Sequence, residues 1–145
     1  QLDTVRNQVF SPGTYTVNFP LANDYVISIE EFSRVAPRYP QTPDLLLKAA
    51  EMARGIRTYQ KAIELFDRLI SNYPEHPKAP QALFMKAFTL DDGLQDYEAA
   101  RAAYILFLEK YPDDDFADDA RFSLDNLGKD INELIDRFET ESIDQ

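Results

Sequence analysis

The residues that come closest to a chemical site are five aspartates in one short segment, at positions 113–115, 118 and 119. Hard cations such as Ca²⁺ prefer several carboxylate and carbonyl oxygens as ligands. A calcium loop of the EF-hand type needs a glycine at its middle and a glutamate at its end, and neither stands here. The spacing instead predicts that Asp114 or Asp115 caps the next helix, with the other carboxylates near the positive end of its dipole. We therefore expect no metal site and no cofactor.

Side chains that commonly catalyse reactions are scarce in this chain. There is no cysteine, and the single histidine, His76, lies in a turn flanked by Pro74 and Pro77. This composition argues against a thiolate nucleophile, a Ser-His-Asp triad and a histidine-rich metal site. The four glycines stand singly, so the sequence has no glycine-rich loop that could hold a phosphate. We expect no catalytic residue and no enzymatic activity.

Charge is distributed unevenly along the 145 residues. Residues 1–90 hold 10 Lys or Arg against 9 Asp or Glu, whereas residues 91–145 hold 5 against 17. The acidic half argues against nucleic-acid binding and suits a partner with a basic surface. No stretch approaches the roughly 20 apolar residues of a membrane-spanning helix. No signal peptide is recognisable in the residues given, and a targeting segment or lipid anchor before Gln1 is left open.

The element that would position any site is a sequence repeat. Six positions match 38 residues later, four with the same residue and two with a similar one, and a fainter copy lies 34 positions upstream. The first set is Tyr59, Ala62, Phe66, Leu69, Tyr73 and Pro74. A period of this length is typical of stacked supersecondary units, none of which can bury its apolar face alone. Such scaffolds usually bind other proteins.

Apolar residues at helical spacing predict helices throughout the repeat and no sheet. The expected helices cover residues 22–36, 43–55, 59–73, 79–92, 96–111, 116–127 and 131–138, the last as a short cap. Pro43 suits a first helical turn, and Gly55 and Gly128 suit helix ends. We divide the chain into an N-terminal segment (1–21, extended or a short helix), an all-α repeat domain (22–138) and a frayed tail (139–145).

The pattern Tyr-x-x-Ala-x-x-x-Phe/Tyr, followed eight residues on by Pro, resembles the second helix of the tetratricopeptide repeat (TPR). The resemblance implies a right-handed α-α superhelix of antiparallel helix pairs. Tyr-Pro at the repeat ends is similar to bacterial envelope TPR proteins, of the Tol-Pal partner and outer-membrane assembly lipoprotein types, and to uncharacterised Bacteroidetes members. The chain departs from the family where Lys48 and Lys86 replace apolar residues. It departs again where Arg57-Thr58 and Gln95-Asp96 replace Gly-Asp in a longer turn.

The resemblance also implies that the first helix of each unit lines a concave surface. On that surface we expect the partner-binding residues Leu47, Arg54, Phe84, Met85, Phe88 and Asp91. Aromatic and methionine side chains in a groove suit an extended or helical peptide. The alternative is that Phe84 and Phe88 fill the core between helices.

Together these features favour a non-enzymatic scaffold or adaptor for protein partners. By resemblance it would lie in the periplasm or at the outer membrane, as a lipoprotein. The alternatives are a structural or self-associating domain whose groove is filled by its own segment, a cation- or peptidoglycan-associated module, and a cytoplasmic location. The identity of the partner and the oligomeric state are left open.

Overall fold

All regular structure in the described part of the chain is helical. The computed structural model describes residues 18–129 and 131–143, and no strand occurs within them. The elements are α2 (Phe19–Val35), α3 (Thr42–Gly55), α4 (Tyr59–Asn72), α5 (Ala79–Phe88), the π-helix η1 (Thr89–Gly93), α6 (Tyr97–Lys110), α7 (Ala117–Asp125) and α8 (Ile131–Ile143). The predicted all-α fold is confirmed for these residues. The N-terminal segment predicted over residues 1–21, as extended or a short helix, lies outside them up to residue 17, and α2 begins three residues before the predicted helix start at Ala22.

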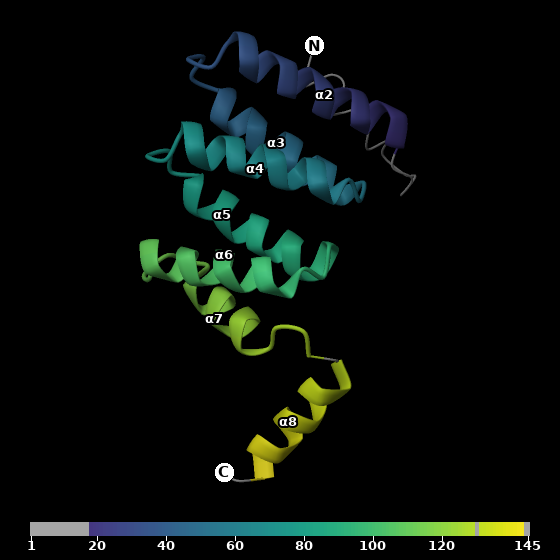
Figure 1. Cartoon of the computed structure of the whole chain (residues 1–145), viewed down its shortest axis with the longest axis vertical. Helices are drawn as coiled ribbons and strands as arrows, with labels where there is room; N and C mark the ends of the chain where they lie inside the picture. The colour runs from purple at the N-terminus through teal and green to yellow at the C-terminus, as the bar shows by residue number, and fades with distance from the viewer. Residues whose placement is uncertain (1–17, 130, 144–145) are drawn as a thin grey trace.

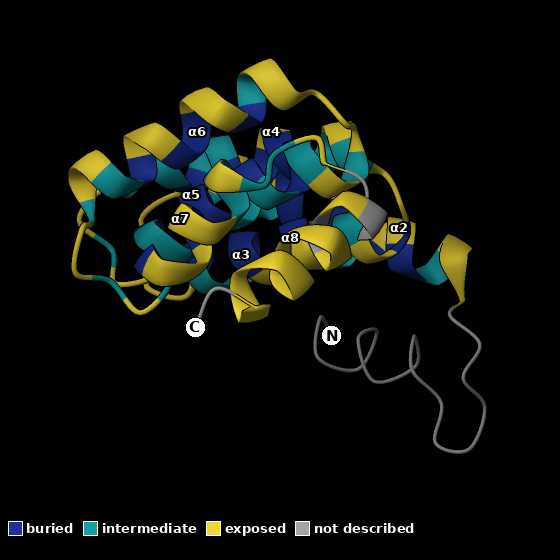
Figure 2. Ribbon diagram, turned by 90° about the horizontal axis from the view of Figure 1, so that it is seen from below, coloured by how far each residue is buried: buried dark blue, intermediate teal, exposed yellow. Residues whose placement is uncertain are grey.

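Helices α2 to α7 form one stack in which each helix packs against the next along the chain (Figure 1). The apolar core runs through the stack as two large clusters, one among α2, α3, α4 and the start of α5, the other among α4 to α7. A small third cluster joins Ala22 to Ile56. Ile70 and Met85 pack against both large clusters. Figure 2 shows the buried residues between the helices and the exposed ones on their outer sides. Each unit thus depends on its neighbours for burial, as in other helical repeats.

Small residues allow the helices to approach closely. Ala62 of α4 and Ala100 of α6 stand at matching positions of the repeat, and neither has any exposed surface. Gly93 serves the same purpose at a repeat junction, because an added Cβ would lie 2.8 Å from Cδ1 of Tyr59. The tyrosine one repeat later, Tyr97, lies against Gly128, whose φ of +73° favours glycine. The helix predicted to end at Leu127 ends instead at Asp125, and Gly128 lies in the turn that follows.

The longer turns predicted before α4 and α6 share one backbone conformation. Arg57 and Gln95, 38 residues apart, have φ of 63° and 54°, in the left-handed region. In the first turn, the backbone N–H and the hydroxyl of Thr58 both donate to the Ala53 carbonyl, each at 2.9 Å. Gly55 ends α3 as predicted, but the left-handed residue is Arg57.

The helix predicted over residues 79–92 is instead divided in two. α5 ends at Phe88, and a wider π-helical turn continues from Thr89 to Gly93. The Thr89 hydroxyl donates to the Met85 carbonyl at 2.6 Å, and the Thr89 carbonyl accepts from the Leu94 N–H at 3.0 Å. The π-turn brings Gly93 against the Tyr59 ring.

The C-terminal end of the stack differs from the prediction. α8 does not close it as a cap: Figure 1 shows this helix leading away from the stack, and Ile135 and Phe138 are 48% and 53% exposed. The helix also continues to Ile143, through most of the segment expected to fray. The physical reason lies in α7, which has 9 residues against 14 in α3 and so offers little surface for another helix.

Candidate functional site

Two rows of side chains face each other where α3 and the start of α5 meet. On α3 the row recurs every three or four residues and therefore occupies one side of the helix. The row on α5 has the same spacing. We call the two rows the α3–α5 strip: Asp44, Leu47, Lys48, Glu51 and Arg54 on one side, with Lys78, Gln81, Met85 and Phe88 on the other.

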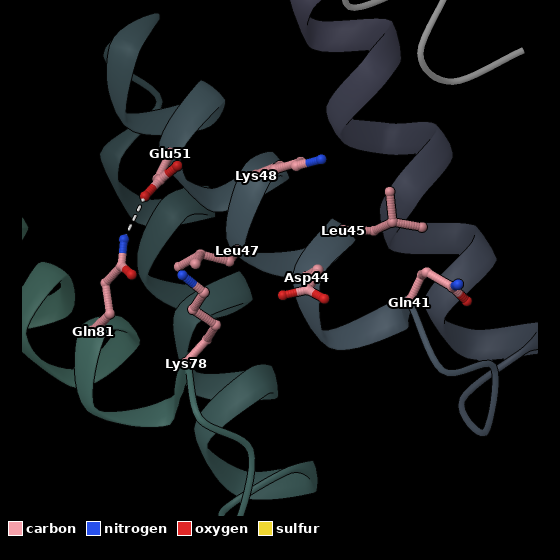
Figure 3. A pocket seen from close by; sticks show the side chains of 8 residues that line it. All are labelled: Gln41, Asp44, Leu45, Leu47, Lys48, Glu51, Lys78 and Gln81. Carbon is pink, nitrogen blue, oxygen red and sulfur yellow. Dashed lines mark hydrogen bonds between the residues drawn. The ribbon is translucent and has the colours of Figure 1, made fainter.

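The first half of the strip lines an open pocket of about 420 Å³ (Figure 3). Gln41 and Leu45 complete its lining. The Gln81 side-chain amide donates to Glu51 at 3.1 Å and so joins the two rows. The lining also holds two lysines, two carboxylates and two leucines: Lys48, Lys78, Asp44, Glu51, Leu45 and Leu47. The pocket therefore offers both signs of charge and a small apolar contact.

Arg54 closes the other end of the strip. Its guanidinium carbon lies 4.6 Å from the centroid of the Phe88 ring, and Nη2 donates to Asp92 at 3.0 Å. A cation over an aromatic face is attracted by the ring quadrupole. The structure thus brings together two of the residues predicted for partner binding, Arg54 and Phe88.

The other predicted site residues are divided between the strip and the core. Leu47 is only 6% exposed, and Met85 is half-buried against both core clusters. Phe84 is 8% exposed, and its ring stacks on Phe116 with centroids 4.8 Å apart. Phe84 therefore lies in the core, as the alternative interpretation of its spacing held, while Phe88 remains half-buried at the strip.

Asp91, also predicted for the site, contacts α6 instead. The Tyr104 hydroxyl donates to its carboxylate at 3.2 Å. Burial raises the pKa of Asp91, the hydrogen bond from Tyr104 opposes this effect, and the charge of Asp92 adds to it. Burial likewise raises the pKa of Tyr104. The pair therefore couples η1 to α6 and does not line the pocket.

A second polar cluster lies between α2 and α4 and centres on Glu30. This residue is only 8% exposed, and its carboxylate accepts from Lys61 at 3.0 Å and forms ion pairs with Arg34 and Arg68. Burial acts to raise the pKa of Glu30, but the Lys61 hydrogen bond and the three positive charges lower it overall. The cluster joins successive repeats and is structural.

The aspartate run contributes to turn and surface contacts. Asp114 accepts from the Phe116 N–H at 3.0 Å, and Asp118 pairs with Arg121 at 2.8 Å. The residue that caps α7 is Phe116, so the predicted aspartate cap is wrong by one or two positions. His76 accepts from the Lys78 N–H at 3.1 Å in its turn. Within residues 18–129 and 131–143, no group of three His, Cys, Asp or Glu could hold a metal ion.

The sequence did not identify the pocket residues Gln41, Lys78 and Gln81 as a site. One signal was present, because Lys48 replaces an apolar residue of the TPR pattern, and its side chain lines this pocket. The other replacement, Lys86, forms an ion pair with Asp67 at 2.6 Å. The pairing of the two rows depends on the angle between helices, which residue spacing does not specify.

A protein family model matches most of the chain. The model of the YfiO family, described as outer membrane lipoprotein, matches residues 6–139 of the chain. No curated protein matches it. In the described ranges, the structure contains no helix with both the length and the apolar character needed to cross a membrane.

Proposed function

Since the chain belongs to the YfiO family of outer membrane lipoproteins, we propose that it is a non-enzymatic adaptor holding a protein partner at the periplasmic face of the outer membrane. The observation that carries this proposal is the α3–α5 strip. The strip combines a pocket, apolar side chains in its lining and charges of both signs. It lies on the side of the stack formed by the first helix of each repeat unit. Those are the features of a peptide-binding groove and not of a reaction centre.

The chemistry of the strip indicates what the partner segment would carry. Within the described residues, neither Lys48 nor Lys78 has an ion-pair partner, and both line the pocket. An extended segment with an acidic residue beside Lys48 or Lys78 and an apolar residue over Leu47 would fit. Charges at the rim would mainly set the association rate, and the apolar contact would set dissociation.

The proposal can be tested by cross-linking in cells that produce the full-length protein. A photo-reactive amino acid replaces Gln81 in the pocket, and the control carries it at Gln60, an exposed residue of α4. Cell fractions are then separated into cytoplasm, periplasm and outer membrane. We expect the protein in the outer-membrane fraction and adducts to envelope proteins from position 81, with few or none from position 60.

Two results would overturn the proposal. One is a cytoplasmic protein. The other is an adduct pattern that is the same for both positions, because a specific groove should give a different pattern from the outer helices. A second variant, Lys48→Glu, should reduce the adducts of position 81 if an acidic partner residue lies beside Lys48.

A further inference from the structure

The C-terminal end of the stack exposes an apolar surface. In the preceding repeat unit, neighbouring helices of the stack cover the equivalent surface. Phe84 on α5 and Phe122 on α7 stand 38 residues apart, at the same position of the repeat. The rings of Phe116 and Phe107 lie 4.8 and 5.9 Å from the Phe84 ring, which is 8% exposed. Phe122 is 51% exposed, because no further repeat follows α7 in the described structure.

α8 extends this apolar surface. The Phe138 ring stacks on Phe122, with centroids 6.4 Å apart and an interplanar angle of 16°. Ile135 lies one turn before Phe138 on the same side of α8 and is 48% exposed. We call Phe122, Ile135 and Phe138 the terminal patch. Apolar side chains that cluster on a surface mark an interaction site more often than single ones do.

The charges around the terminal patch define its partner. Residues 113–145 hold 12 Asp or Glu and 3 Lys or Arg. Two of the three cations are engaged locally, Arg121 with Asp118 at 2.8 Å and Arg137 with Glu141 at 3.0 Å. A second copy of the chain would bring the same negative charge to the contact, and like charges oppose association. The patch therefore suits a partner with positive charges around an apolar ridge.

The repeat also indicates the form of that partner. In the stack, the side of a first helix is covered by a helix whose buried side holds small and aromatic residues. Tyr104 and Phe107 of α6 lie against Phe84, and Ala100 and Ala103 are buried on the same helix. We infer that the terminal patch binds a basic amphipathic helix of another protein, which packs on Phe122 and Phe138 where a further repeat would lie. This site is separate from the α3–α5 strip, and its occupation does not depend on the function proposed for the strip.

The test uses a fluorescent synthetic helix of about 18 residues, with leucines along one face and lysines elsewhere. A twin peptide has glutamates in place of the lysines. Binding to the full chain is followed by fluorescence anisotropy at roughly 20 mM and 300 mM salt, because screening weakens contacts between exposed charges. We expect the lysine peptide to bind, more weakly at high salt, and the glutamate twin not to bind.

Variants distinguish binding at the terminal patch from a general attraction between opposite charges. Phe122→Ala with Phe138→Ala removes the apolar contact and leaves the net charge unchanged, and should weaken binding about tenfold or more. Ile105→Ala, which removes a similarly exposed apolar residue of α6 and also leaves the net charge unchanged, should change binding less than about twofold. Thermal unfolding of each variant confirms that it is folded.

Equal binding by the parent and the double variant would overturn the inference, because net charge alone would then explain the affinity. Dimerisation of the parent through the patch would also overturn it. Light scattering detects this outcome as a larger mass that the double variant lacks.

Discussion

Arg54 and Asp92 occupy the same position of successive repeats, and their side chains form an ion pair at 3.0 Å. One repeat unit thus carries a cation where the next carries an anion, so the offset of 38 residues brings opposite charges together. Phe88 lies beneath the same guanidinium, at 4.6 Å from its carbon. Arg54 therefore links two units at the end of the candidate groove.

We expect Arg54→Ala to lower the free energy of unfolding by about 1 kcal/mol, mainly through the lost contact with Phe88. The ion pair itself contributes less, because Asp92 is largely exposed to solvent. Urea unfolding measures the change. Arg121→Ala is the control, since Arg121 forms an ion pair with the exposed Asp118 and should change stability by less than about 0.5 kcal/mol. Equal losses in both variants would contradict the assigned role of Phe88.

The buried alanines should tolerate no larger side chain. Ala62→Leu and Ala100→Leu insert extra atoms where two helices meet, so each should destabilise the protein by about 1–3 kcal/mol. Ala102→Leu provides a matched control on α6, because Ala102 is exposed and leucine is also a good helix former. Melting temperatures of the three variants compare the sites. If Ala100→Leu melted like Ala102→Leu, α6 would be rotated relative to the structure described here.

Glycine substitutions should separate close packing from helix propensity. Gly93→Ala places a methyl group 2.8 Å from the Tyr59 ring and should destabilise by about 1–3 kcal/mol. Gly55→Ala meets no atom within 4 Å and should be neutral or stabilise by about 0.5–1 kcal/mol. Chemical denaturation tests both. Adding Tyr59→Ala should remove most of the Gly93→Ala penalty, and a full penalty in the double variant would show that the ring is not its cause.

The Glu30 cluster should make stability depend on pH. The pKa of Glu30 lies below its ordinary value of 4.5 because the hydrogen bond and charges described above outweigh burial. A carboxyl with a lowered pKa stabilises the folded state above its unfolded pKa, and this contribution is lost as the pH falls through the folded pKa. We expect Glu30→Gln to destabilise the protein at neutral pH and to reduce the further loss of stability below about pH 4.5.

Glu31→Gln is the control for the Glu30 prediction, because Glu31 is exposed on the same helix. Its unfolding free energy should follow that of the parent across the pH range. A parallel pH dependence for Glu30→Gln and the parent would show that other carboxyls dominate acid unfolding.

The helices could be predicted from the sequence because the repeat and the 3.6-residue spacing of apolar residues both indicate which side chains are buried. Ala62, Ala100 and Gly128 were interpretable from residue type alone. The π-turn at Thr89 and the left-handed Arg57 were not, because each is a tertiary adjustment by residues without a strong conformational preference. Glu30 gave no signal either, since a buried carboxylate differs from an exposed one only through its partners on another helix.

The candidate site was predictable only in part, because residue spacing shows which side chains share one side of a helix but not how that helix is rotated in the stack. Helical spacing placed Arg54 and Phe88 on facing helices correctly. It could not distinguish Phe84 from Phe88, which lie one turn apart on α5, because the rotation of α5 determines which ring is buried. Gln81 was missed because its role depends on Glu51, which belongs to the preceding repeat.

The sharing of Ile70 and Met85 between the two core clusters has a consequence for the order in which the molecule opens. These residues lie in the middle of the stack, so amide hydrogens of α4 and α5 should exchange with solvent last, as a cooperative unit. Exchange should begin at α8, which leads away from the stack, and should then reach α7, where Phe122 is exposed. The most readily opened part of the molecule is then the part where a basic helix would bind, and such a ligand would slow exchange there first.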